Sequence, residues 1–287
     1  MYIPPMTKSL ALRVEYSDVN YFIARTRVLQ AIPQNPYGAQ LRQFGAAVGF
    51  AVQATRHPVF NRVMGASDET VDYLDEILGW YRTHHCHCRF DILPSNATEK
   101  LLPALAQRGF YQAGFYAALY AAAEYHTDYT APATLYLERI PSGDRELMLD
   151  VYAAGFNFSA KTQPVMRASL RGLFDSPNVR FYGANINDKL VGISTLFLSD
   201  SVGYVASSTT LPQYRGRGCQ PALLNRALAD AALEQCDLVV SHCGFASISQ
   251  RNLERIGLRL AYTKAVWTQR RPLEAKSPSA DTTALDV

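Results

Sequence analysis

The chain has 287 residues, of which 48% are hydrophobic and 18% are charged. This apolar content is enough to form a core and excludes a disordered chain, and the length predicts one large domain or two ordinary ones. The net charge of +3 gives no support to nucleic-acid binding. No apolar run approaches the ~18 residues of a membrane span, so no membrane partner is expected.

The cysteine content and the start of the chain predict a cytoplasmic protein. Five cysteines are an odd number spread over a long chain, which favours reduced thiols over a disulfide framework. The first twenty residues lack the continuous apolar core of a signal peptide.

The first half of the chain predicts strands alternating with helices. In chain order these are a strand-like run at 44–54, the segment 60–65, a helix from about Ser67, a strand at 90–94, a helix at 101–109 and a strand at 111–120. Gly109 suits the end of its helix, where a positive φ costs little. Periodicity is then interrupted at 126–133.

The second half predicts an antiparallel meander followed by strand–helix–strand elements. Its predicted strands are 134–140, 179–186, 189–198, 202–209, 237–242 and 261–268, and its helices are 145–156, 162–173, 218–235 and 248–256. In the third of these helices Leu224, Ala227, Leu228 and Ala231 have helical spacing and would face the sheet. This is an α/β (α+β) pattern.

The unit of helix, glycine and strand recurs about half a chain later, around Gly257. A repeat of that length predicts two related domains, although such units are also common by coincidence. We place the first domain at 1–128, the second at 129–270 and a polar, flexible tail at 271–287.

The loop at 211–220 carries the clearest chemical signal, because Gly216 and Gly218 precede a predicted helix. Two glycines bring backbone N–H groups close to a ligand, and a helix start adds unpaired donors and a positive dipole end. No Asp or Glu occurs from residue 202 to 229, whereas Arg215, Arg217 and Arg226 do. The pattern favours a pyrophosphate site over a plain helix start with surface arginines. It lacks both the Walker A lysine and the third glycine of a dinucleotide fingerprint.

The pattern Gln213-x-x-Gly216-x-Gly218 resembles motif A of the GCN5-related N-acetyltransferases, the GNAT superfamily. Residues 249–258 resemble that family's motif B helix, so the resemblance covers about 134–269. It implies acetyl-CoA as acyl donor and two GNAT-like domains, each a mixed, mainly antiparallel sheet flanked by helices. It also implies that backbone groups at one strand end hold the pantetheine arm, and these residues are Ser208, Thr209 and Thr210. The loop that follows would hold the pyrophosphate, and its residues are Gln213, Arg215, Gly216, Arg217, Gly218, Cys219 and Gln220.

The chain departs from the family at the proton-transfer positions. The motif B tyrosine falls at Leu253, and the asparagine of that motif falls at Ala246. His242, at a strand end near the expected cleft, is a candidate base. Candidate substitutes for the acid are Tyr262, Cys243 and Tyr204, each of which also suits simple core packing.

The first half carries acids where the second half carries arginines. Asp68, Glu69, Asp72, Asp75 and Glu76 occupy the place that matches the pyrophosphate loop. Carboxylates suit a helix start but repel a pyrophosphate. We therefore expect a degenerate first domain that has lost cofactor binding and shapes the substrate cleft or the domain interface.

Two features near cysteines give further expectations. The run His84-His85-Cys86-His87-Cys88 lacks the spacing of a zinc knuckle, and strand alternation would split its ligands between two faces, so no metal is expected. Cys219 stands at a helix start beside arginines, which predicts a lowered thiol pKa.

Together the residues and the resemblance predict an acetyl-CoA-dependent N-acetyltransferase that acts on a primary amine, with a small molecule as the default acceptor. Two alternatives stay open. One is a non-catalytic acyl-CoA-binding or scaffold protein, motivated by the absent tyrosine. The other is a protein or peptide N-acetyltransferase. A homodimer also stays open.

Overall fold

A computed structural model describes residues 4–123 and 130–269. The helices are α1 (Lys8–Gln30), α2 (Leu74–Thr83), α3 (Leu101–Gln107), α4 (Arg145–Gly155), α5 (Gln163–Arg171), α6 (Cys219–Leu233) and α7 (Ile248–Arg255). The strands are β1 (Ala39–Phe44), β2 (Ala47–Val52), β3 (Arg62–Met64), β4 (Arg89–Ile92), β5 (Phe110–Ala122), β6 (Tyr136–Arg139), β7 (Val179–Ile186), β8 (Lys189–Ser199), β9 (Val202–Thr210), β10 (Leu238–Gly244) and β11 (Arg259–Gln269).

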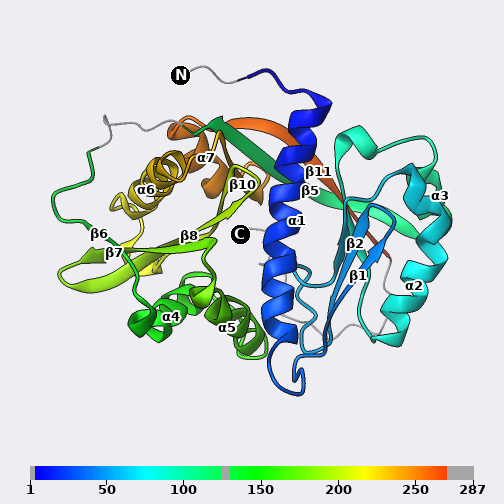
Figure 1. The fold of residues 1–287 in the computed structure, drawn as a ribbon, viewed down its shortest axis with the longest axis horizontal. Coiled ribbons are helices and arrows are strands. Elements are labelled where there is room, and N and C mark those ends of the chain that lie inside the picture. Colours follow the sequence, from blue (N-terminus) through cyan, green and yellow to red (C-terminus); the bar gives the residue numbers. More distant parts are fainter. Residues whose placement is uncertain (1–3, 124–129, 270–287) are drawn as a thin grey trace.

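All eleven strands form one sheet in the order β1-β2-β3-β4-β11-β5-β10-β9-β8-β7-β6 (Figure 1). Neighbouring strands are antiparallel except for β3 with β4 and β10 with β9. The predicted fold class, a mixed and mainly antiparallel sheet flanked by helices, is therefore confirmed.

The two predicted halves exchange their last strands at the centre of this sheet. β5 from the first half pairs with β10 of the second, from Leu238 opposite Ala122 to Gly244 opposite Tyr116. β11 from the second half lies between β5 and β4 of the first. Each half is therefore completed by a strand of the other. The domain boundaries drawn from the sequence stay a prediction.

The longest helix, α1, was not predicted from the sequence. It begins after Thr7, whose side chain accepts a hydrogen bond from the Leu10 N–H at 3.1 Å. Its buried residues include acids and an arginine as well as apolar side chains, for example Glu15, Asp18 and Arg25. These buried polar residues obscure the apolar periodicity by which an amphipathic helix is recognised. In Figure 1 the helix runs between the two flanking parts of the molecule.

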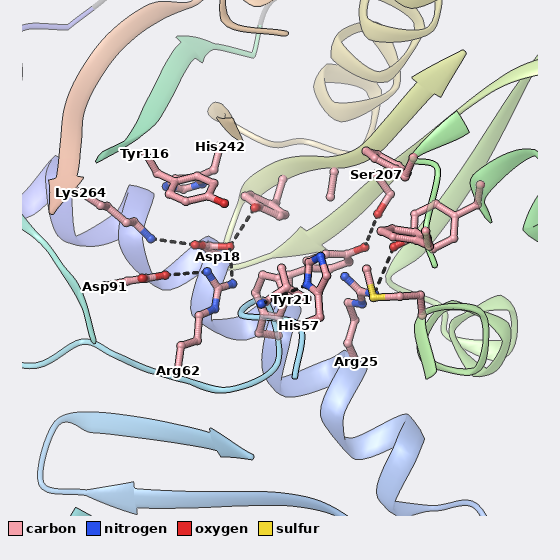
Figure 2. Close-up of a pocket in the computed structure, with 18 residues that line it drawn as sticks. Asp18, Tyr21, Arg25, His57, Arg62, Asp91, Tyr116, Ser207, His242 and Lys264 are labelled. Carbon is pink, nitrogen blue, oxygen red and sulfur yellow. Dashed lines mark hydrogen bonds and ion pairs between the residues drawn. The ribbon is translucent and has the colours of Figure 1, made fainter. Parts of the chain in front are cut away.

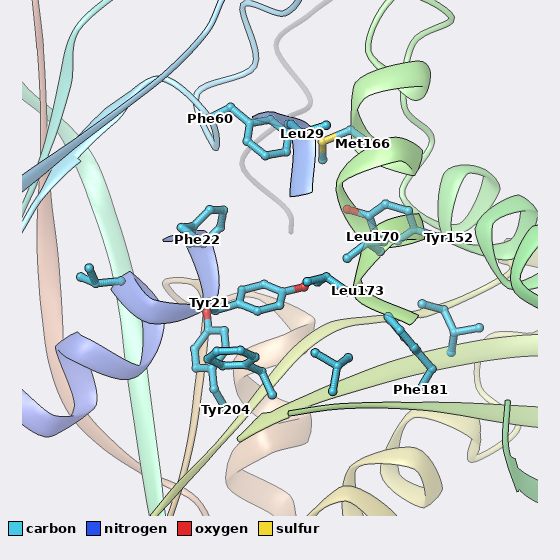
Figure 3. Packing of buried hydrophobic residues seen from close by; sticks show 14 of the residues in the cluster. Tyr21, Phe22, Leu29, Phe60, Tyr152, Met166, Leu170, Leu173, Phe181 and Tyr204 are labelled. Carbon is cyan, nitrogen blue, oxygen red and sulfur yellow. The ribbon is translucent and has the colours of Figure 1, made fainter. Parts of the chain in front are cut away.

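The main hydrophobic core surrounds α1 (Figure 3). Tyr21, Phe22 and Leu29 of this helix pack with Tyr204 on β9 and with residues of α4 and α5. A second cluster lies under α6, and there the four apolar residues predicted to face the sheet are all buried. A third cluster packs α2 and α3 against β2, β3 and β4. Full burial of each large apolar side chain contributes about 1.5–3 kcal/mol.

Two predicted elements of the first half differ from the structure. The strand expected at 44–54 is one arm of a hairpin, in which the chain turns between Phe44 and Ala47 with Gly45 at φ 60°. The helix expected from Ser67 begins as a 3-10 helix over Asp68–Tyr73 and continues as α2. The expected tail at 271–287 and part of the expected interruption at 126–133 lie outside the described residues.

Candidate active site

The predicted pyrophosphate loop joins β9 to α6, as the sequence indicated. Gly216 has φ 77°, and Gly218 caps α6 at φ 81°, so both stand in the left-handed region that favours glycine. The space around Gly216 is open, whereas a Cβ on Gly218 would lie 2.9 Å from Pro132 Cγ. No acidic residue occupies the first turn of α6. The loop therefore offers the N–H groups and positive potential that suit a phosphate.

The arginines of this loop keep their positive charge available. Arg215 donates hydrogen bonds to the backbone oxygens of Thr210 at 3.2 Å and Gly155 at 2.9 Å, which tie the loop to the end of α4. Arg217 is exposed and its guanidinium lies 5.3 Å from the centre of the Tyr214 ring. Gln213 is also exposed. A charge paired with carbonyl groups or a ring is not neutralised, so it remains able to attract an anion.

Gln220, in the first turn of α6, is held by the predicted motif B helix α7. Its side-chain amide donates to Ser249 Oγ at 3.3 Å, and its side-chain oxygen accepts from Asn252 at 2.6 Å. These bonds fix α7 against the start of α6. The two motifs that carried the resemblance therefore lie together in the fold.

The strand before the loop, β9, separates from its neighbour β10 at the place where the pantetheine arm was predicted to bind, while it stays paired with β8. β9 pairs with β10 in parallel only as far as Val205 opposite Ser241, yet it continues to Thr210. Ser207 adopts φ 52° beside a register shift in the β8–β9 pairing, and Ser208 shares a 2.6 Å hydrogen bond with Ser194. Thr210 Oγ1 is buried and has no hydrogen-bond partner among the described residues. The end of β9 thus has a neighbouring strand, β8, on one side only, and an extended ligand can pair with its other side.

This strand end leads into a pocket closed by α1 (Figure 2). Ala206 and Ser207 line it from β9, and the Tyr21 hydroxyl lies 3.1 Å from Ser207 Oγ. The remaining lining residues are Asp18, Phe22, Arg25, His57, Val59, Arg62, Asp91, Tyr116, Tyr152, Phe156, Phe158, Met166, Tyr204, His242 and Lys264. Both halves of the chain and both exchanged strands therefore build the pocket, which combines aromatic walls with buried charges.

One side of the pocket is an ion-pair cluster made of Glu15, Asp18, Arg62, Arg89, Asp91 and Lys264. Lys264 Nζ lies 2.8 Å from Glu15 Oε2 and 2.7 Å from Asp18 Oδ2. Asp91 accepts from Arg62 at 2.7 Å and from Arg89 at 2.6 Å. Three acids thus meet three bases, and the buried cluster is balanced in charge.

The charges of the cluster fix the protonation of its members. Burial alone would raise the pKa of Asp18, but the charges of Lys264 and Arg62 outweigh that effect and hold it well below its usual range. The negative charges of Asp18, Glu15 and Asp91 raise the pKa of Lys264, although its burial acts in the opposite direction. Asp18 and Lys264 are therefore both charged at neutral pH.

The structure places the candidate base His242 in the pocket wall. Both ring nitrogens are buried and have no hydrogen-bond partner among the described residues. Burial, together with the nearby charge of Lys264, lowers the pKa of His242 to about 3. The imidazole is therefore neutral at pH 7, so it can accept a proton, but it is a weak base.

The other proton-transfer candidates are engaged elsewhere. Tyr262 donates to Glu15 Oε2 at 3.2 Å, and Tyr204 donates to Asp18 Oδ1 at 2.8 Å; burial raises the pKa of both phenols well above 10. Burial also raises the pKa of Cys243 to about 12. Of these three residues only Tyr204 lines the pocket.

The expectation for the Cys219 thiol was wrong. Arg217 does act to lower its pKa, but burial of the thiol outweighs that charge and raises it. The helix start and the arginines were visible in the sequence, whereas the packing of Cys219 among the apolar residues under α6 was not.

The acids at the matching place in the first half form local contacts. Asp75 pairs with Arg108 at 2.8 Å, Glu76 pairs with Arg42, and Asp68 accepts a hydrogen bond from Thr98. Loss of cofactor binding in this half stays a prediction. Over residues 4–123 and 130–269, no group of three His, Cys, Asp or Glu side chains is placed to hold a metal ion. None of the described helices is long and apolar enough to cross a membrane.

Sequence reasoning missed the contribution of α1 to the site. Asp18, Tyr21 and Arg25 reach the pocket from this helix, and each stands three or four residues from the next. That spacing puts them on one helix face. A polar face with helical spacing inside an apolar segment was the signal that could have revealed them.

The chain resembles known proteins in one segment of its sequence and in its fold. Residues 146–256 match the model of the acetyltransferase (GNAT) family. The fold is similar to a GCN5-related N-acetyltransferase from Kribbella flavida, with a TM-score of 0.62 and 13% identity over 86% of this chain and 96% of the other. A GCN5-related N-acetyltransferase from Sphaerobacter thermophilus has a TM-score of 0.57 and 14% identity over 77% and 76%.

A third similar structure is a tandem GNAT protein from the clavulanic acid biosynthesis pathway, with a TM-score of 0.55 and 14% identity over 88% of this chain and 95% of that one. In each case the similarity extends over most of both chains. At identities this low it supports the fold and carries no conclusion about function. The curated proteins include no match to this sequence.

Proposed function

Because residues 146–256 match the model of the acetyltransferase (GNAT) family, we propose that this protein is an N-acetyltransferase that uses acetyl-CoA and acts on a primary amine of a small molecule. The observation that carries the proposal is that the phosphate-binding loop, the strand before it and the pocket adjoin one another. The glycine loop, the end of β9 beyond its pairing with β10, and the pocket behind Ser207 lie along a single strand–loop–helix segment. Its order suits a ligand with a phosphate end and a reactive end.

The cofactor would lie along this segment in an extended form. The first N–H groups of α6 and the loop around Gly216 and Gly218 would bind the pyrophosphate. Backbone groups of Ser208, Thr209 and Thr210 would bind the pantetheine arm where β9 has left β10. Acetyl-CoA supplies the thioester that the acceptor amine attacks. The residues Ala206 and Ser207 would then face that thioester at the pocket.

The pocket favours the uncharged form of an acceptor amine. Its aromatic walls exclude water, which penalises an ammonium group, and Arg25, which has no acidic partner among the described residues, adds like charge. A neutral amine is the nucleophile that the reaction needs. His242, itself neutral, would accept the proton that the amine loses. Positioning of the amine beside the thioester would supply much of the rate.

Tyr21 is the residue that we assign as proton donor to the leaving thiol. Leu253 replaces the tyrosine expected in motif B and is buried in the cluster under α6. Tyr21 instead brings a phenol to the bulge of β9, 3.1 Å from Ser207 Oγ. Burial raises the pKa of Tyr21, which keeps its proton in place until it is transferred.

The proposal is tested by following CoA release from acetyl-CoA over a panel of small amines. Gly216→Glu and Gly218→Glu put a carboxylate into the phosphate-binding loop and should abolish both acetyl-CoA binding and turnover. The matched control is Gly143→Glu, because Gly143 is exposed and a side chain there meets no atom within 4 Å. This control should behave as the unaltered protein.

Two outcomes would point to other functions. Acetyl-CoA binding without turnover over the whole panel would favour a non-catalytic acyl-CoA-binding protein, for which the absence of the motif B tyrosine at Leu253 is the supporting observation. Turnover of peptides but not of small amines would favour a peptide N-acetyltransferase. Binding unchanged by Gly218→Glu would contradict the placement of the cofactor.

A further inference from the structure

Arg25 is a buried cation in the pocket wall without an acidic partner. The residue is 3% exposed and projects from α1. Its Nε and Nη2 donate to Ser169 Oγ at 3.2 and 2.6 Å, and Nη2 also donates to the Tyr152 hydroxyl at 3.4 Å, so Nη1 is the nitrogen without a hydrogen-bond partner among the described residues. Over the described residues, no carboxylate lies within 4.0 Å of it. Two neutral hydroxyls leave its full positive charge uncompensated.

The nearby acids are not available to neutralise Arg25. Glu15, Asp18 and Asp91 are matched one for one by the three bases of the ion-pair cluster. In the view of Figure 2, Lys264 and Asp91 lie toward one end of the pocket, and Arg25 lies toward the end that holds Ser207. The pocket without ligand therefore has an excess positive charge at the end next to the proposed thioester position.

Aromatic rings reduce the free-energy cost of burying the Arg25 guanidinium and hold it in place. The guanidinium carbon lies 4.9 Å from the ring centre of Phe60 and 5.5 Å from those of Tyr21 and Phe22. Such contacts stabilise a cation without neutralising its charge. An arginine fixed in this way keeps the N–H donors of Nη1 for a ligand, and a carboxylate is the group that such charged donors bind most strongly.

We propose that Arg25 binds a carboxylate of the acceptor, so that the substrate of this enzyme is an amino acid or another primary amine that carries a carboxylate. The inference rests on the proposed function, because it takes the pocket as the acceptor site. The amine would point toward Ser207 and the carboxylate toward Arg25. Phe156, Phe158 and Met166, which line the same pocket, would contact the apolar part of the acceptor.

The test compares acceptors that differ only in the anionic group. Turnover is measured for glycine, β-alanine, 4-aminobutyrate and L-phenylalanine, each beside its carboxamide, and 2-aminoethylphosphonate is compared with β-alanine. At least one acid should exceed its amide in kcat/KM by about tenfold to a hundredfold, the range expected for a hydrogen-bonded charge pair. Equal use of acids and amides would overturn the assignment of Arg25, and preference for the phosphonate would overturn the assignment of a carboxylate.

Variants of Arg25 separate recognition from stability. Arg25→Gln should remove the preference for the acid, and Arg25→Lys should retain part of it. Arg13→Gln, on the same helix but in an exposed pair with Asp237, is the matched control and should keep the full preference. A purely structural arginine would lower the melting temperature and leave the acid-to-amide ratio unchanged. If Arg25→Gln does not fold, the acid-to-amide ratio of Arg25→Lys is the deciding measurement: a reduced ratio supports the carboxylate site, and an unchanged ratio contradicts it.

A binding experiment keeps this inference distinct from the proposed function. Calorimetry with CoA present compares N-acetyl-L-phenylalanine with its amide and requires no turnover. Preference for the acid, lost in the Arg25 variants, supports the anion site even if no amine is acetylated, in which case the proposed function alone fails. Turnover of neutral amines without any preference for the acid would leave the function standing and overturn the anion site.

Discussion

The buried His242 should make the protein lose stability as the pH falls from 7 to 5. Its pKa is about 3 in the folded protein, against an ordinary value of 6.5 when it is exposed by unfolding. Between those values only the unfolded chain takes up the proton, so stability decreases as the pH falls through 6.5 and the loss ends near pH 3. From pH 7 to pH 5 the expected loss is about 2 kcal/mol at 1.36 kcal/mol per pKa unit.

The assay is urea unfolding at both pH values for the unaltered protein and for His242→Gln. The variant lacks the titrating ring, so its change in stability between the two pH values should be about 2 kcal/mol smaller. His85→Gln is the control, because His85 is exposed to water and should leave the difference unchanged. Equal pH dependence in the unaltered protein and in His242→Gln would refute the neutral, buried state of His242.

Three further results are expected. Tyr21→Phe should lower kcat by about 100-fold, the lower range for general acid catalysis, while the Kd of acetyl-CoA stays the same; an unchanged kcat would remove Tyr21 from proton transfer. Lys264→Met should lower the free energy of unfolding by about 3–5 kcal/mol, because Glu15 and Asp18 lose their buried partner, whereas Arg13→Met, in an exposed pair, should cost about 1 kcal/mol or less. Cys219, buried with a raised pKa, should react with iodoacetamide only after unfolding; rapid labelling of the native protein would contradict its burial.

The proposed cofactor side of the site could be predicted from the sequence because it depends on one short segment. Gly216 and Gly218 stand two residues apart, and their need for a positive φ and the helix start of α6 are properties of one short segment. The apolar spacing of α6 predicted its buried face in the same way. Such features depend on residues a few positions apart, and these could be compared directly in the sequence.

The proposed acceptor side could not be predicted, because it depends on the exchange of strands between the halves. Asp18, Asp91 and Lys264 come from α1, β4 and β11, and they meet only because β11 crosses to lie beside β4. A lysine in an apolar strand gives no sign of which acid it pairs with. The predicted lowering of the Cys219 pKa was wrong for a related reason. The burial of this thiol is set by packing across the molecule, and its effect on the pKa outweighs that of the local charges.

Hydrogen exchange with and without acetyl-CoA tests the central claim most directly. The account predicts that the cofactor slows exchange of backbone N–H groups over residues 206–220, from the end of β9 through the first turn of α6. Residues 60–76, the matching part of the first half, should exchange at the same rate in both states. Protection at 60–76 without protection at 206–220 would contradict both the placement of the cofactor and the function derived from it.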